Sequence, residues 1–166
     1  MTTTQATETT QTAHDRIDFQ GAVPDYARAM TRLQQASTKE VSDAGIEPLL
    51  HELVKIRASQ LNGCAYCIDM HTKDARAMGE TEQRLYALPA WRETSFYTAR
   101  ERAALAYAES VTLQADTHVP DDVRAAVAAE FSEREVAALI TAIVTINSWN
   151  RIVVTTRAYE PGSYQP

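Results

Sequence analysis

The chain has 166 residues, of which 45% are hydrophobic and 23% charged, a balance typical of one compact globular domain and not of a disordered chain. The formal net charge of −6, without a lysine or arginine cluster, argues against nucleic acid or an anionic membrane as a partner. No apolar run approaches the roughly 18 residues that span a bilayer, and the N-terminus lacks the regions of a secretory signal. We therefore expect a cytoplasmic protein.

The N-terminal part of the chain separates into a tail and an arm. Residues 1–14 are mostly threonine and glutamine, and we expect a disordered tail before a single helical domain over residues 15–166. Residues 15–23 should form an irregular arm, whose Ile17, Phe19 and Val23 lie in a groove on the body or on a partner subunit.

Helical periodicity and capping signals then predict about seven helices. They cover approximately residues 24–36, 48–61, 64–78, 81–88, 98–113, 120–130 and 132–156, with capping boxes at 98–101 and 132–135 and glycine stops at Gly63 and Gly79. The polar stretch 37–44 should break the first helix. Residues 140–154 are apolar nearly all round and should be buried. Because no segment alternates with a period of two, the predicted fold class is all-α.

The residues with the clearest chemistry lie in the third predicted helix. Cys64 and Cys67 are three residues apart, and His71 follows Cys67 by four, so all three lie along one side of a helix. The helix N-terminus raises the thiolate fraction of a cysteine in its first turn. His71 is placed to accept a proton from Cys67 or to stabilise its thiolate.

Glu52 lies on the preceding helix. If Gly63 lets that helix fold back antiparallel, Glu52 comes near His71, where a carboxylate fixes the imidazole tautomer and raises its basicity. The sequence therefore predicts a relay from Glu52 through His71 to a cysteine, with the second cysteine within disulfide reach.

These residues also allow interpretations other than thiol chemistry. A zinc site at Cys64, Cys67 and His71 lacks a fourth ligand, and a CxxC within one helix cannot close a tetrahedron alone. We therefore predict neither a metal nor a tightly bound cofactor. His14, His51 and His118 are interpreted as surface histidines without a role. Tyr66 and Met70 are interpreted as core or interface residues.

The stretch from Glu52 to Glu80, with its Glu52, Cys64, Cys67 and His71, resembles the alkyl hydroperoxidase D-like branch of the carboxymuconolactone decarboxylase family at every spacing. The segment INSWNRI over residues 146–152 is also similar to this branch. The resemblance spans residues 45–155. It implies an all-helical fold that assembles into trimers or hexamers, and a thiol peroxidase activity reduced by a lipoyl-type dithiol. It also implies that the second cysteine attacks the peroxide and the first resolves it.

This chain departs from the best-understood member at Tyr66, where that protein has an additional histidine; a tyrosine cannot act as a base near neutral pH. Position at the helix start alone favours Cys64 as the nucleophile, whereas His71 and the resemblance favour Cys67. We expect a peroxidase that acts on organic hydroperoxides or H2O2 and is reduced by an external lipoyl-type or thioredoxin-like dithiol protein. The alternative is a dithiol redox sensor or disulfide-exchange protein with little turnover.

The predicted assembly is a homo-oligomer, a hexamer built as a trimer of dimers or a trimer. Tyr66, Ile68 and Met70 cannot all point inward together with the two cysteines and His71, so both faces of this helix need cover. A neighbouring subunit is the simplest source of that cover, and we expect the active site to lie at or near a subunit contact.

Overall fold

The structure, a computed structural model, describes residues 16–166 of the chain. The expected disordered tail over residues 1–14 lies outside this range. All regular structure within the range is helical, which confirms the all-α class. The elements are α1 (Phe19–Ala22), α2 (Pro24–Asp43), α3 (Pro48–Leu61), α4 (Ala65–Ala77), α5 (Glu82–Ala87), the 3₁₀ helix η1 (Leu88–Glu93), α6 (Ala99–Thr112), α7 (Gln114–Thr117), α8 (Asp121–Glu130) and α9 (Glu133–Thr156).

The longer helices are the expected ones, and local signals explain where they begin. Both predicted capping boxes form: Thr98 exchanges hydrogen bonds with Glu101 at the start of α6, and Ser132 does so with Glu135 at the start of α9. Two single-turn helices of four residues, α1 and α7, and the 3₁₀ helix η1 are additional to the prediction.

The predicted break over residues 37–44 is wrong, because α2 continues to Asp43. Ser37 and Val41 are buried on the side of α2 that faces the body. The Ser37 hydroxyl lies 3.2 Å from the Thr141 hydroxyl of α9, and Val41 joins the main apolar core. Most other side chains of the stretch are exposed, so its polarity reflects a solvent-facing helix surface rather than a loop.

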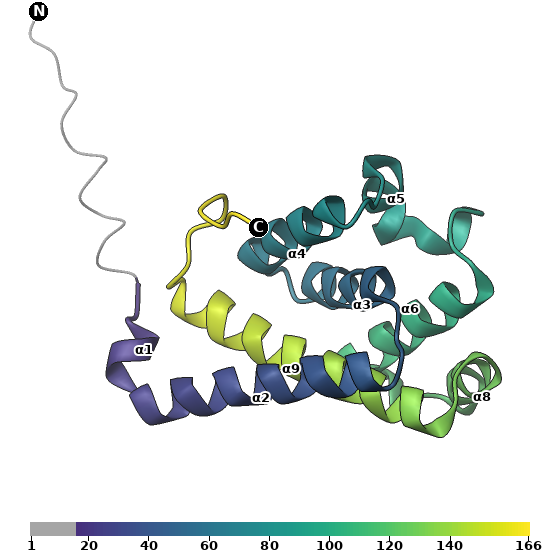
Figure 1. The fold of residues 1–166 in the computed structure, drawn as a ribbon, viewed down its shortest axis with the longest axis horizontal. Helices are drawn as coiled ribbons and strands as arrows, with labels where there is room; N and C mark the ends of the chain where they lie inside the picture. Colours follow the sequence, from purple (N-terminus) through teal and green to yellow (C-terminus); the bar gives the residue numbers. More distant parts are fainter. Residues whose placement is uncertain (1–15) are drawn as a thin grey trace, which may run out of the picture.

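The predicted irregular arm contains the short helix α1. The Ile17 backbone N–H donates to the Thr156 carbonyl at 3.0 Å, so the arm lies beside the C-terminal end of α9 (Figure 1). Phe19 is half-buried and meets Tyr26 edge-on, whereas Ile17 and Val23 are exposed in the single chain. The arm is therefore attached through the Ile17 backbone and through the side chains of Arg16 and Gln20, which bond Glu160 and Tyr159. No groove of the described part of this chain covers Ile17 or Val23.

Helix α3 occupies the centre of the molecule. It packs along α4, α6 and α9, so other helices surround it (Figure 1). All six residues from His51 to Ile56 are consequently buried, including three with polar or charged side chains. A carboxylate or an ammonium group on this helix must find its partners inside the protein.

Helix α9 crosses the molecule next to α2 (Figure 1). The expectation that residues 140–154 are wholly buried is only partly correct, because Ile140, Val144 and Val154 are exposed in the single chain. By length and composition alone, α9 is the one helix of residues 16–166 that could cross a membrane, and half of its apolar window is buried inside the fold. The prediction that no apolar stretch approaches this length is therefore wrong for α9.

Candidate active site

The turn between α3 and α4 positions the two cysteines. Gly63 adopts a φ of +66°, a left-handed conformation that favours glycine. The Cys64 N–H then donates to the Ser59 carbonyl at 3.0 Å and the Gly63 N–H to the Gln60 carbonyl at 3.3 Å, which is the Schellman pattern of a helix end. Cys64 becomes the N-cap of α4, and Cys67 lies in the first turn of that helix. The predicted glycine stop and helix start are both confirmed.

Cys64 and Cys67 are joined as a disulfide, with their Cα atoms 5.4 Å apart. Both side chains are buried, and they pack with Ala58, Ile146 and Val153 in a small apolar cluster. The pair can therefore exist in the oxidised form without movement of the backbone, since this Cα separation lies within the range of ordinary disulfides.

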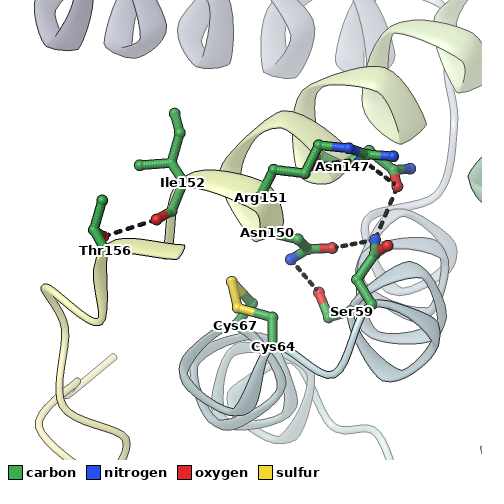
Figure 2. Close-up of a disulfide and its surroundings, with 9 residues drawn as sticks. Ser59, Cys64, Cys67, Asn147, Asn150, Arg151, Ile152 and Thr156 are labelled. Carbon is green, nitrogen blue, oxygen red and sulfur yellow. Dashed lines mark hydrogen bonds between the residues drawn. A yellow bond between two sulfur atoms is a disulfide. The ribbon is translucent and has the colours of Figure 1, made fainter. Parts of the chain in front are cut away.

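A network of amide side chains holds α9 against the end of α3, directly beside the disulfide. Figure 2 shows Asn150 of α9 beside the disulfide, with its amide bonded to Ser59. Asn150 Nδ2 donates to the Ser59 hydroxyl at 3.0 Å, and Asn62 Nδ2 donates to the Oδ1 atoms of both Asn150 and Asn147 at 2.9 and 2.8 Å. The INSWNRI segment thus supplies the two asparagines that fix the turn preceding the cysteines.

Glu52 and His71 meet across the α3–α4 hairpin, as the sequence predicts. Glu52 Oε2 lies 3.0 Å from His71 Nδ1, and both side chains are buried. Burial would raise the pKa of Glu52, but the bond with His71 and the charge of Lys55 outweigh it and lower this pKa to about 2. Burial lowers the pKa of His71, against the opposing effect of Glu52.

The lowered pKa values of Glu52 and His71 define the tautomer of His71 at neutral pH. An ionised carboxylate has no proton to donate, so the neutral His71 ring carries its proton on Nδ1 and donates it to Glu52. Nε2 of His71 is left with a free lone pair as a proton acceptor. His71 and Cys67 line the same cavity, of about 340 Å³.

Lys55 completes this buried polar group, and the sequence interpretation missed it. Its ammonium Nζ donates to Glu52 Oε1 at 2.6 Å, so each carboxylate oxygen of Glu52 has one partner. The Glu52–Lys55 separation of three residues on one helix was the available signal. Both residues resemble solvated helix positions in the sequence, and only the central place of α3 makes them a buried ion pair.

His51 is also buried, which contradicts its interpretation as a surface histidine. Burial is the main cause that lowers its pKa to about 3, and the nearby Lys55 charge adds to this effect. His51 is therefore neutral over the physiological pH range. His118 is exposed, as expected, whereas His14 lies outside the described residues.

The C-terminal segment after α9 folds back over α4 and reaches the site (Figure 1). The Tyr164 hydroxyl donates to Asp74 at 2.7 Å, and Lys73 Nζ donates to the Tyr164 carbonyl at 2.9 Å. The ring of Tyr159 lies against that of Tyr66, with centroids 5.0 Å apart. Tyr66 is half-buried, and burial raises its pKa above the ordinary value, so it stays protonated. Nothing in the local sequence signalled that this segment belongs to the site.

One cluster of the site has atoms that could hold a metal ion. Ligand atoms of Glu52, His71 and Asp74 lie within 4.8 Å of one another. Both carboxylates also accept hydrogen bonds, Glu52 from Lys55 and His71, and Asp74 from Tyr164. The zinc set considered from the sequence needs two free thiolates, which the disulfide does not provide.

Comparison with known proteins now identifies the class. The family model described as "Carboxymuconolactone decarboxylase family" matches residues 24–110. The chain is 43% identical over 139 residues to the uncharacterised protein YdfG of Bacillus subtilis, covering 84% of this chain and 92% of that protein. The chain belongs to the carboxymuconolactone decarboxylase family.

Solved structures narrow this assignment. A protein of unknown function from Agrobacterium tumefaciens, described in relation to the antioxidant defence protein AhpD, is 39% identical with a TM-score of 0.81, covering 89% of this chain and 98% of that one. The debrominase Bmp8, bound to 2,3,4-tribromopyrrole, shares the fold at 21% identity and a TM-score of 0.73, covering 86% of this chain and 74% of its own. The chain thus has the AhpD-like fold, and the first likeness supports an antioxidant role.

Proposed function

We propose that the protein is a thiol-dependent peroxidase, which reduces organic hydroperoxides or H2O2 through a dithiol/disulfide cycle of Cys64 and Cys67. The observation that carries this proposal is the hydrogen bond between Glu52 and His71, because it leaves Nε2 of His71 as the proton acceptor of a residue that lines the same cavity as Cys67. The disulfide supports the second half of the cycle, since the two sulfurs are within bonding reach.

In the first step His71 Nε2 takes the proton of the reduced Cys67 thiol, and the thiolate attacks the terminal oxygen of the hydroperoxide. The O–O bond breaks, Cys67 becomes a sulfenic acid, and the leaving oxygen takes a proton from the His71 imidazolium to give an alcohol or water. Glu52 stabilises the imidazolium while it exists. The Cys64 thiol then attacks the sulfenic sulfur, water leaves, and the disulfide forms.

An external dithiol closes the cycle. Its two thiols reduce the disulfide by exchange and become a disulfide themselves, so that one hydroperoxide and one dithiol give one alcohol and one water. We propose a lipoyl-type or thioredoxin-like protein in this role. Cys67 is assigned as the nucleophile because it shares its cavity with His71, whereas Cys64 does not line that cavity.

The test is a peroxidase assay with cumene hydroperoxide and H2O2, in which dihydrolipoamide, thioredoxin and glutathione are compared as reductants. Cys67→Ser should abolish peroxide reduction. Cys64→Ser should still form a sulfenic acid at Cys67, detectable with a dimedone probe, but should not turn over. A Cys67→Ser protein that retains a peroxide-reactive thiol would reverse the two roles.

Stopped-flow oxidation separates this proposal from the alternative of a disulfide-exchange protein. In a peroxidase, the hydroperoxide oxidises the reduced cysteine pair much faster than it oxidises free cysteine. If the wild-type pair reacts with every tested hydroperoxide only as slowly as free cysteine, yet exchanges rapidly with dithiols, the peroxidase proposal fails and the alternative stands.

A further inference from the structure

Each cysteine of the pair borders a different cavity. Cys67 and His71 line one of about 340 Å³, and Cys64 lines another of about 350 Å³. The two cavities share three lining residues, Tyr66, Val153 and Tyr159, and have no others in common. These three side chains therefore form the boundary between two approaches to one disulfide.

The aromatic part of this boundary depends on the C-terminal segment. Tyr159 follows α9 and places its ring 5.0 Å from the ring of Tyr66 on α4. Its hydroxyl accepts a hydrogen bond from Gln20 Nε2 at 2.8 Å. The segment beyond it is held on α4, because the Gly162 N–H donates to Asp69 at 3.0 Å and Tyr164 donates to Asp74. Tyr159 is thus fixed from both sides.

The two cavities differ in chemistry. Around Cys67 the lining carries no charged residue apart from the titratable His71 and is mostly aromatic and aliphatic, with Met70, Ile146 and Trp149 beside the shared boundary and Gln34 as a further polar residue. Around Cys64 the lining carries charge from Arg16, Arg157 and Glu160, which belong to the arm and the C-terminal segment. Transfer of an apolar molecule from water into the first cavity is favourable. A polar partner loses less of its hydration in the second cavity than it would in the first.

Building on the peroxidase function above, we propose that Tyr159 is a specificity-determining residue, which separates the route of the hydroperoxide from the route of the reducing thiol. The hydroperoxide enters the cavity of Cys67 with an apolar carbon skeleton against Met70, Ile146 and Trp149. The reducing thiol reaches Cys64, which is buried in the oxidised form, from the side of the charged cavity.

The chemistry of reduction agrees with this division. The thiolate of the reductant attacks Cys64 Sγ, a new S–S bond forms there, and the bond to Cys67 breaks. Cys67 leaves as a thiolate beside His71 and takes up the proton that the attacking thiol gave up. The second thiol of the reductant then attacks the reductant sulfur that is bound to Cys64. The reductant becomes a disulfide, and Cys64 leaves and takes up the proton of that second thiol. The reduced pair of Cys64 and Cys67 can then react with the next hydroperoxide in the other cavity.

Two tertiary hydroperoxides of matched reactivity test the substrate side. Cumene hydroperoxide differs from tert-butyl hydroperoxide by a phenyl group in place of a methyl group, so their ratio of oxidation rate constants reports apolar contact. We expect the wild-type protein to favour cumene hydroperoxide by about tenfold or more, as apolar pockets do for larger apolar groups. Tyr159→Ala should lower that ratio several-fold, Tyr159→Phe should keep it, and the exposed Tyr86→Ala should serve as the control.

The outcomes of this test are distinct. A wild-type ratio near one would overturn the apolar route while leaving the peroxidase function intact. An unchanged ratio in Tyr159→Ala would remove Tyr159 as the determinant. If neither hydroperoxide oxidises the reduced protein faster than free cysteine, the underlying peroxidase proposal fails instead. Circular dichroism confirms that the variants remain folded.

The reductant side has a readout that does not depend on peroxidase activity. The oxidised wild-type protein is mixed with 2-mercaptoethanol, quenched with iodoacetamide and analysed by tandem mass spectrometry. We expect the mercaptoethanol adduct on Cys64 and the carbamidomethyl group on Cys67. The reverse distribution would show that the thiol approaches Cys67, and equal labelling in the wild type would show that no separation exists.

Discussion

Glu52 Oε2 lies 3.0 Å from His71 Nδ1, although the two residues are 19 positions apart in the chain. The hairpin between α3 and α4 creates this contact, and the burial of α3 isolates it from water. A hydrogen bond between an ionised carboxylate and an imidazole orients the ring and favours its cation when a proton arrives. The consequences can be measured at Glu52, at its second partner Lys55, and at the neighbouring His51.

Glu52→Gln retains the shape of the side chain but removes its charge. The imidazolium of His71 then loses its stabilising partner, and we expect oxidation of the reduced Cys67 to slow by about 10- to 100-fold. Stopped-flow tryptophan fluorescence of the reduced protein with cumene hydroperoxide measures this rate. Glu82→Gln, an exposed position on α5, is the matched control. Oxidation of Glu52→Gln at the wild-type rate would show that Glu52 has no part in the relay.

Lys55 acts on His71 through charge, and its removal should change the pH dependence. The Lys55 ammonium lowers the pKa values of both Glu52 and His71. In Lys55→Met the pKa of His71 should rise, so the neutral, proton-accepting ring is lost at a higher pH. We expect the acidic limb of the Cys67 oxidation rate to move to higher pH in Lys55→Met and to return towards its wild-type position in Lys55→Arg. A purely structural role would lower the rate without moving the limb.

His51 should make the protein less stable in mild acid. Its folded-state pKa is about 3, whereas an unfolded histidine has a pKa of about 6.5. Between these values the unfolded state binds the extra proton, so the free energy of unfolding falls as pH decreases through this window. At pH 5 the loss from His51 should be about 2 kcal/mol relative to neutral pH.

Urea unfolding at pH 7.5 and pH 5, at one fixed protein concentration, measures this loss. His51→Gln should show a smaller decrease between the two pH values than the wild type. The exposed His118→Gln should behave like the wild type. An equal decrease in wild type and His51→Gln would mean that His51 is protonated without cost in the folded protein.

The exposed apolar side chains of α2 and α9 give a second reason to expect an oligomer, beside the need to cover Tyr66, Ile68 and Met70 on α4. Tyr26 and Leu33 lie on one side of α2, and Ile140, Val144 and Val154 are exposed on α9. Exposed apolar rows on neighbouring helices are typical of subunit contacts. We expect light scattering at micromolar concentration to give a mass of three or six times the 18.4 kDa of one chain, with the hexamer favoured by the family resemblance.

A charge on this surface tests its role. Val144→Glu should lower the mass if α9 contributes to the contact, whereas a charge at an already polar exposed position, Thr38→Glu, should leave it unchanged. A wild-type mass of 18.4 kDa would refute the oligomer. A Val144→Glu protein with the wild-type mass would place the contact elsewhere.

The sequence by itself determined the helical class, the ends of most helices and the line of Cys64, Cys67 and His71. These features depend on neighbours a few residues away: a capping box needs four residues, and the turn at Gly63 needs about six. The polar residues of α2 misled the prediction at residues 37–44, because one helix face can be polar and still continue.

Only the tertiary structure decided which polar groups lose their water. His51, Glu52 and Lys55 have the composition of a solvent-exposed helix surface, but α3 is enclosed by α4, α6 and α9. Glu52 therefore takes its partners, Lys55 and His71, from inside the protein, and His51 is held neutral by burial. The place of Tyr159 between the two cavities likewise depends on a chain segment more than 90 residues beyond Tyr66. Burial and long-range contact are properties of the whole packed chain, and no local pattern of residue types specifies them.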